Sequence, residues 1–169
     1  MHPIKKAVCE EILSLLKHHD STVRKNTISS LRRPRFIYSR VEKAQIDYFI
    51  DNNQEFLNKL IDQLCQLVTD LSPEVQEAAL TTLTVFHGYR LVNKMVQLKR
   101  EKIVESTTAL LQERNVSAEV LISAAKLLQK YKACESHKIL EHALTQFQKT
   151  NPPNPKVERV VVQAVKSLQ

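Results

Sequence analysis

Glycine and tryptophan are scarce in this sequence, which has one glycine and no tryptophan in 169 residues. β-Rich folds depend on tight turns with positive φ, a conformation that glycine adopts at little cost. The scarcity of glycine therefore favours helices joined by short polar turns. Because 43% of the residues are hydrophobic and 25% are charged, the composition is that of a folded domain. We predict a single all-α domain over residues 1–169, which buries roughly 70% of its unfolded surface.

Long apolar runs are also missing, and none approaches the length of a membrane span. The N-terminal sequence MHPIKKAVCEE turns acidic where a signal peptide would need an apolar core. The cysteines Cys9, Cys65 and Cys134 are odd in number and far apart. This is typical of reduced thiols inside a cell and not of a disulfide framework. We expect an intracellular protein, cytoplasmic or nuclear, that has no membrane partner.

The residue combinations that carry catalysis or bind cofactors are weak. A Gly-rich phosphate loop needs more than one glycine, and spacing alone pairs no nucleophile with a base. Cys134, His137 and Glu141 fall at i, i+3 and i+7, but a zinc site needs a further ligand. We therefore predict a protein that is not an enzyme, without catalytic residues, a metal or a cofactor.

Positive charge is in excess and is unevenly distributed, with a formal net charge of +7. Residues 1–50 carry ten Lys or Arg against five Asp or Glu, residues 51–97 three against six, and residues 98–169 twelve against seven. Two basic ends therefore flank a mildly acidic middle. Such a field favours nucleic acid, acidic peptides or anionic surfaces as partners, although the same charge also serves solubility alone.

A four-residue pattern that ends in valine recurs along the chain. Each copy opens with Asp, Ser or Asn, whose side chains accept hydrogen bonds from the N–H groups of a first helical turn. Two copies place proline next, at a helical position that needs no N–H. The four copies are Asp20–Val23 (DSTV), Ser72–Val75 (SPEV), Ser117–Val120 (SAEV) and Asn154–Val157 (NPKV).

Apolar residues keep the same register after each valine. At five and eight residues beyond it stand Ile28 and Leu31, Leu80 and Leu83, Ala125 and Leu128, and Val162 and Val165. Before each cap, apolar residues at intervals of three and four predict another amphipathic helix. These helices are expected at residues 4–18, 54–69, 98–113 and 135–149. The unit is a helix, a turn and a capped helix, in four repeats of approximate limits 4–33, 39–86, 88–132 and 134–169.

Two insertions lengthen the first intervals between the repeats. Residues 39–51 predict an extra helix, and residues 88–97 predict a short one. The only glycine, Gly88, stands where a residue of left-handed conformation often ends a helix.

The segments ILSLLKHHDSTVRKNTISSL and LIDQLCQLVTDLSPEVQEAALTTL resemble HEAT/armadillo repeats. Val23 with Arg24, and Val75 with the pair Ala78–Ala79, match the family pattern. The third and fourth units depart from it, because Leu121 and Glu158 replace the arginine. The resemblance implies a right-handed α-solenoid of about four repeats, in which each hairpin packs against its neighbours. It says little about function.

The resemblance also implies expectations about the ends of the chain and about catalysis. The last repeat ends without a polar capping helix, so we expect the N-terminal part of a longer protein, or an end covered by a partner or by a second copy. Some related proteins are DNA glycosylases that hold bases between aromatic side chains. The lack of tryptophan weakens that expectation here.

The capped helices are expected to line one face and to bind a partner there. Positions two, six, nine and ten after each valine point away from the packed stripe. The cations at these positions are Lys25, Arg32 and Arg33, then Lys126 and Lys130, then Arg159 and Lys166. The second unit differs, with Glu77 among threonines. We predict an interaction scaffold that binds an acidic or amphipathic peptide segment through charge-assisted hydrogen bonds, unless these side chains are only a solvated face.

The densest basic stretch, LRRPRFIYSR, offers an alternative function. It mixes Arg32, Arg33, Arg35 and Arg40 with aromatic residues, a combination that contacts phosphates and stacks on bases. The alternative is therefore a nucleic-acid-binding repeat protein. The aromatic residues could instead fill the core while the arginines remain in water.

Overall fold

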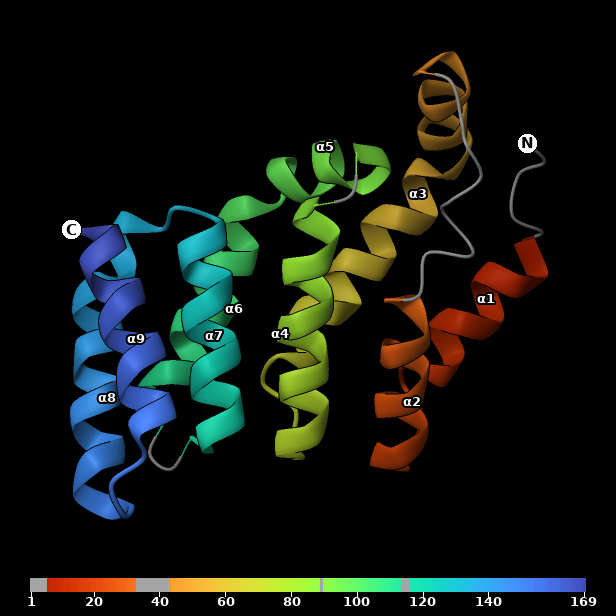
Figure 1. Cartoon of the computed structure of the whole chain (residues 1–169). Helices are drawn as coiled ribbons and strands as arrows, with labels where there is room; N and C mark the ends of the chain where they lie inside the picture. Colours follow the sequence, from red (N-terminus) through yellow and green to blue (C-terminus); the bar gives the residue numbers. More distant parts are fainter. Residues whose placement is uncertain (1–5, 33–42, 89, 114–115) are drawn as a thin grey trace.

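The computed structural model describes residues 6–32, 43–88, 90–113 and 116–169, and every regular element in these ranges is helical (Figure 1). This confirms the all-α prediction for the described residues. None of the described helices is both long and apolar enough to cross a membrane. The elements are α1 (Lys6–Leu15), α2 (Ser21–Leu31), α3 (Lys43–Leu67), α4 (Pro73–Gly88), α5 (Arg90–Leu98), α6 (Arg100–Gln112), α7 (Ala118–Lys130), the 3₁₀ turn η2 (Cys134–Ser136), α8 (His137–Thr150) and α9 (Pro155–Leu168).

The helices form two layers of neighbouring hairpins (Figure 1). In one layer α4 packs between α2 and α7, and α7 packs in turn against α9. We call α2, α4, α7 and α9 the capped layer, since each of these helices follows one of the four repeated turns. In the other layer, α3 contacts α1 and α6, and α6 contacts α8. The additional helix α5 packs on α3 and α4.

Three of the four predicted caps have the expected hydrogen bond. The side chain of Asp20 accepts from the Thr22 N–H at 2.7 Å. Ser117 and Asn154 accept from the N–H three residues on, at 3.3 and 3.2 Å. These bonds satisfy donors that a first helical turn leaves without a partner inside the helix.

The turn at Ser72 is built differently. Its hydroxyl donates to the Glu74 carboxylate at 2.7 Å, while its backbone carbonyl accepts from the Val75 N–H at 3.0 Å. The Ser72 N–H donates to the carboxylate of Asp70 at 2.9 Å. Asp70 thus organises this turn together with Ser72.

Most of the aligned apolar positions form the core between the layers, whereas Val23 and Leu31 of the first repeat are only partly buried. Val75, Val120 and Val157 are fully buried, as are Leu83 and Leu128 eight residues after two of them. Val162 keeps 41% of its surface exposed. The buried stripe of α9 runs through Val157, Val161, Ala164, Val165 and Leu168. Val162 is not part of this stripe and points to one side of it. α7 is buried on more sides because it packs between α4 and α9.

Two expectations about the insertions are wrong. Residues 39–51 and 54–69 do not form separate helices, because α3 runs without a break from Lys43 to Leu67. The intervening Asp-Asn-Asn sequence has no proline or glycine to end a helix. Gly88 does not have positive φ but completes α4, and among the described residues Lys132 has that conformation, with φ of 50°. The predicted helix at 88–97 is confirmed as α5.

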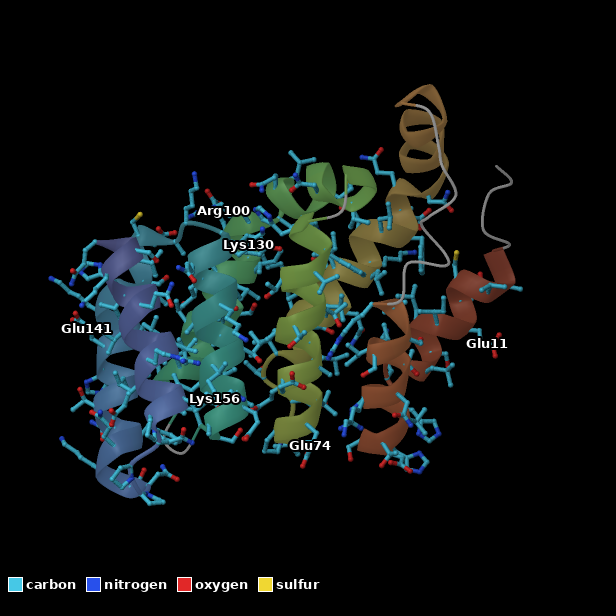
Figure 2. The ribbon with its side chains drawn as sticks, viewed as in Figure 1. Glu11, Glu74, Arg100, Lys130, Glu141 and Lys156 are labelled. Atoms are coloured by element: carbon cyan, nitrogen blue, oxygen red, sulfur yellow. The ribbon has the colours of Figure 1, made fainter. Side chains whose placement is uncertain are left out.

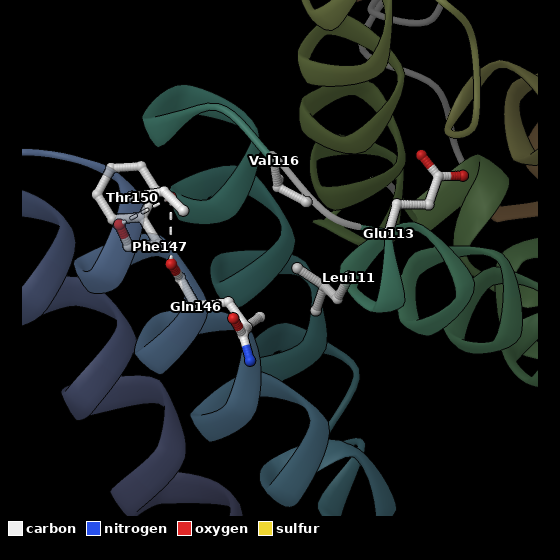
Figure 3. A pocket seen from close by; sticks show the side chains of 7 residues that line it. Leu111, Glu113, Val116, Gln146, Phe147 and Thr150 are labelled. Carbon is white, nitrogen blue, oxygen red and sulfur yellow. Dashed lines mark hydrogen bonds between the residues drawn. The ribbon is translucent and has the colours of Figure 1, made fainter.

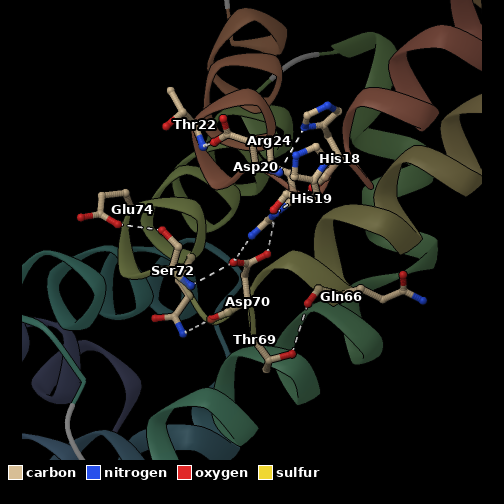
Figure 4. Close-up of polar contacts among 11 residues, drawn as sticks. His18, His19, Asp20, Thr22, Arg24, Gln66, Thr69, Asp70, Ser72 and Glu74 are labelled. Atoms are coloured by element: carbon tan, nitrogen blue, oxygen red, sulfur yellow. Dashed lines mark hydrogen bonds and ion pairs between the residues drawn. The ribbon is translucent and has the colours of Figure 1, made fainter.

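A polar network ties the first hairpin to the second (Figure 4). Arg24 donates to both carboxylate oxygens of Asp70, and also to the backbone carbonyls of His18 and His19 at 2.7 and 2.8 Å. Gln76 occupies the position of Arg24 in the second hairpin and donates to the Asp70 carbonyl at 2.6 Å. In both hairpins, the residue after the valine binds the carbonyl five residues before that valine. The shared contact shows that these two turns are structurally equivalent.

Candidate partner-binding surface

Four of the predicted site residues gather on two neighbouring helices of the capped layer. Lys126 and Lys130 project from α7, while Arg159 and Lys166 project from α9, and all four are exposed. The two helices pack side by side. Within the described ranges, none of these four side chains forms an ion pair or a hydrogen bond. We call the four residues the basic ridge.

Lys25 lies apart from the basic ridge, in a shallow hollow of about 440 Å³. The hollow opens between the N-terminal halves of α2, α4 and α7. It is lined by Lys25, Pro73, Glu74, Glu77, Ser117 and Glu119. We call this set the acidic hollow, because three carboxylates face one ammonium group there. Figure 2 shows Glu74 at the N-terminal end of α4 and Lys130 at the C-terminal end of α7.

Glu74 and Glu119 were not among the predicted site residues, although the sequence carried a signal for them. They occupy the third position of the aligned turns SPEV and SAEV. That position is Thr22 in the first turn and Lys156 in the fourth. The two middle repeats therefore place an acid where the outer two do not. A carboxylate is also favoured at this position because it lies in the first turn of a helix.

The environment of Glu74 favours its charged form. The hydrogen bond from the Ser72 hydroxyl lowers the pKa of Glu74, and the nearby Lys25 ammonium lowers it further. Glu77 accepts a hydrogen bond from the Thr81 hydroxyl at 2.9 Å. The acidic hollow thus holds carboxylates that are fixed in part by hydroxyl donors of α4 and of the turn before it.

Arg32 is used inside the fold. Its Nε donates to the Thr82 hydroxyl at 2.9 Å, and its Nη2 donates to the Ala78 carbonyl at 3.0 Å. Burial lowers the pKa of this guanidinium group. Arg32 therefore joins α2 to α4. Arg33, Arg35 and Arg40 lie outside the described residues.

Ile122 also departs from the expected outward-facing pattern. It is the second residue after Val120, a position predicted to point away from the packed stripe, but only 7% of its surface is exposed. The reason is that α7 has helices packed on both sides within the capped layer. The face of α7 that remains accessible is correspondingly narrow, and it carries the two lysines of the basic ridge.

A second, smaller pocket of about 150 Å³ lies between α6 and α8 (Figure 3). Leu111, Val116, Ala143 and Phe147 form its apolar part, and Glu113, Gln146 and Thr150 complete the lining. The Thr150 hydroxyl donates to the Gln146 carbonyl at 3.2 Å. The pocket has room for a small apolar group, and it opens in the layer that does not carry the basic ridge.

The cysteines lie in different environments, and one of the described histidines, His87, lies near Lys130 of the basic ridge. Burial raises the pKa of the Cys65 thiol to about 11, so this thiol is protonated at neutral pH. Cys134 is exposed, and its carbonyl lies 2.8 Å from Nδ1 of His137. In the part of the chain that the structure describes, no three residues among His, Cys, Asp and Glu are placed to hold a metal ion.

Comparison of the chain with protein-family models, with curated proteins and with solved structures found no match in any of the three. The resemblance to HEAT/armadillo repeats therefore depends on the sequence pattern alone. The basic ridge and the acidic hollow are the two charged surfaces on which a partner could bind.

Proposed function

We propose that this chain is a non-enzymatic interaction scaffold that binds an acidic or amphipathic segment of another protein on its capped layer. The observation that supports this proposal is the basic ridge, with its four exposed cations on adjacent helices. Carboxylates of a partner would form charge-assisted hydrogen bonds with these side chains. Because none of the four cations has an ion-pair partner within the described residues, each remains available to a carboxylate of the partner.

As part of the same proposal, the four hairpins form a right-handed α-solenoid of the HEAT/armadillo type. The regular order of the hairpins supports this, since each one contacts its neighbours in both layers. The equivalent contacts of Arg24 and Gln76 support a common origin for the first two turns. A solenoid presents an extended face, which suits an elongated ligand.

The test begins with capture of partners from a lysate and mapping of the bound segment to a synthetic peptide. That peptide is then titrated against the wild-type chain and against the double variant Lys126→Glu with Arg159→Glu. We expect saturable binding that the double variant loses. The control replaces Lys138 and Lys149, two exposed lysines of α8 in the other layer, with glutamate. Equal affinity of the wild type and the Lys126/Arg159 variant would exclude the basic ridge.

The alternative is that the same cations bind the phosphates of a nucleic acid. Binding would then weaken steeply with salt, because phosphate neutralisation releases counterions. A gel shift with single- and double-stranded DNA and RNA at low salt tests this directly. Arg32 is already bonded to α4, so Arg32→Ala should lower stability whichever ligand binds. The scaffold proposal expects no shift at micromolar protein.

A further inference from the structure

The capped layer carries both signs of charge in a fixed order, and this order restricts what can lie along it. On α7, Glu119 is followed seven residues later by Lys126 and eleven residues later by Lys130. Residues at these spacings lie on the same side of a helix. Since a helix rises 1.5 Å per residue, the lysines stand about 10 and 16 Å beyond Glu119. The charge of this one face therefore changes sign along α7.

The helices on either side of α7, which are α4 and α9, show the same separation of acidic from basic residues. On one side, α4 contributes Glu74 and Glu77 to the acidic hollow. On the other side, α9 contributes Arg159 and Lys166 to the basic ridge. The Thr81 and Ser123 hydroxyls lie 3.5 Å apart and mark where α4 meets α7. The acidic hollow and the basic ridge thus meet on α7.

We infer that the segment bound by the basic ridge also carries a cationic side chain, which enters the acidic hollow beside Glu77 and Glu119. This inference rests on the proposed function and specifies the ligand that the function requires. An extended peptide advances about 3.3 Å per residue, so the cation stands about three residues from the nearest acidic residue. The partner segment is therefore dipolar, with a lysine or arginine at one end and carboxylates toward the other.

The charge balance of the acidic hollow favours this arrangement over a uniformly acidic ligand. Lys25 offsets only one of the three carboxylates that line it. A glutamate of the partner placed there would face like charges, which disfavours binding. A cation of the partner placed there would offset a second carboxylate.

The test uses two fluorescent peptides of identical composition. One carries a lysine, a neutral spacer of about three residues and a block of glutamates; the other carries the lysine inside the block. The first is made in both chain directions, because the charge order leaves the direction open. In anisotropy titrations, one direction of the dipolar peptide should bind about fivefold more tightly than the mixed peptide, the upper range for one exposed ion pair.

Two double variants test whether the acidic hollow causes the preference for the dipolar peptide. The double variant Glu77→Gln with Glu119→Gln should bind both peptides equally. The control Glu101→Gln with Glu105→Gln, on exposed positions of α6, should keep the preference. Circular dichroism confirms that each variant is folded.

The outcomes separate this inference from the proposed function. If all peptides bind the wild type equally, and the Lys126/Arg159 variant loses that binding, the ridge proposal stands and the dipolar ligand is excluded. If the preference persists without Glu77 and Glu119, the acidic hollow is not its source and the inference is overturned. If neither peptide binds, both the inference and the proposed function fail.

Discussion

Arg24 of the first hairpin binds both carboxylate oxygens of Asp70 in the turn of the second, with an Nε–Oδ2 distance of 2.9 Å and an Nη2–Oδ1 distance of 2.8 Å. Both side chains are largely buried, with 14% and 9% of their surfaces exposed. The bidentate geometry fixes the relative orientation of the two groups. Removal of one partner would leave the other charge poorly solvated.

We expect Arg24→Ala to lower the free energy of unfolding by about 2–3 kcal/mol, because it removes charged hydrogen bonds to Asp70 and to two carbonyls. Urea denaturation followed by circular dichroism measures this. The matched control is Lys25→Ala at the next position, where the side chain is exposed; its effect should stay within about 0.5 kcal/mol. Similar losses in the two variants would show that the Arg24–Asp70 pair contributes little.

A second prediction concerns the two positions where backbone conformation and residue type disagree. Gly88 lies in a helix, and an added Cβ would meet no atom within 4 Å. Gly88→Ala should therefore raise the free energy of unfolding by about 0.5–1 kcal/mol. Thermal and urea denaturation would both report the gain. Destabilisation would contradict the helical conformation of Gly88.

The converse substitution is Lys132→Gly, because Lys132 has a φ of 50° after the end of α7. Glycine adopts this conformation without the steric cost that a Cβ brings. We expect a gain of about 0.5–1 kcal/mol in the free energy of unfolding. Lys126→Gly, at an exposed position within α7, serves as the control and should instead be destabilising.

Stability should depend on pH through His87. Partial burial, together with the nearby Lys130 ammonium, lowers the pKa of His87 below its ordinary value of 6.5. Its Nε2 lies 2.9 Å from the Gln97 amide nitrogen, which suits a neutral ring that accepts a hydrogen bond. The unfolded chain then binds the proton more readily than the folded chain, so stability falls as pH drops below about 6.5.

The measurement for His87 is urea denaturation between pH 7.5 and pH 5. His87→Gln should show a smaller loss of stability over this range than the wild type, because glutamine does not take up a proton. His142→Gln, at an exposed position of α8, should keep the wild-type dependence. Equal slopes for the wild type and His87→Gln would exclude His87 as the group responsible.

The thiols should differ in reactivity in the native protein. Cys134 is exposed, whereas burial raises the pKa of Cys9 and raises that of Cys65 to about 11. Since the thiolate is the reactive form, a disulfide reagent at pH 7.5 should modify Cys134 first. The fast phase should disappear in Cys134→Ser and remain in Cys65→Ser. A fast phase that persists without Cys134 would mean that a buried thiol is accessible.

Much of the local structure followed from the sequence. The caps at Asp20, Ser117 and Asn154 were predictable, because each depends on a hydrogen bond between residues two or three positions apart. The scarcity of glycine and the repeated apolar spacing likewise indicated an all-helical chain. The same reasoning erred at Gly88, where the residue type suggested a left-handed conformation that the backbone does not have.

The sequence by itself thus determined most of the helices, three of the four caps and the outward positions of the cations on α7 and α9, since these depend on neighbours along one helix. The tertiary structure decided which distant residues meet. Arg24 binds a carboxylate 46 residues away in the sequence, and Arg32 of α2 donates a hydrogen bond to Thr82 of α4. The carboxylates Glu74 and Glu119 come together because α4 and α7 pack side by side. Such meetings depend on the order and spacing of packed helices, which no local pattern specifies.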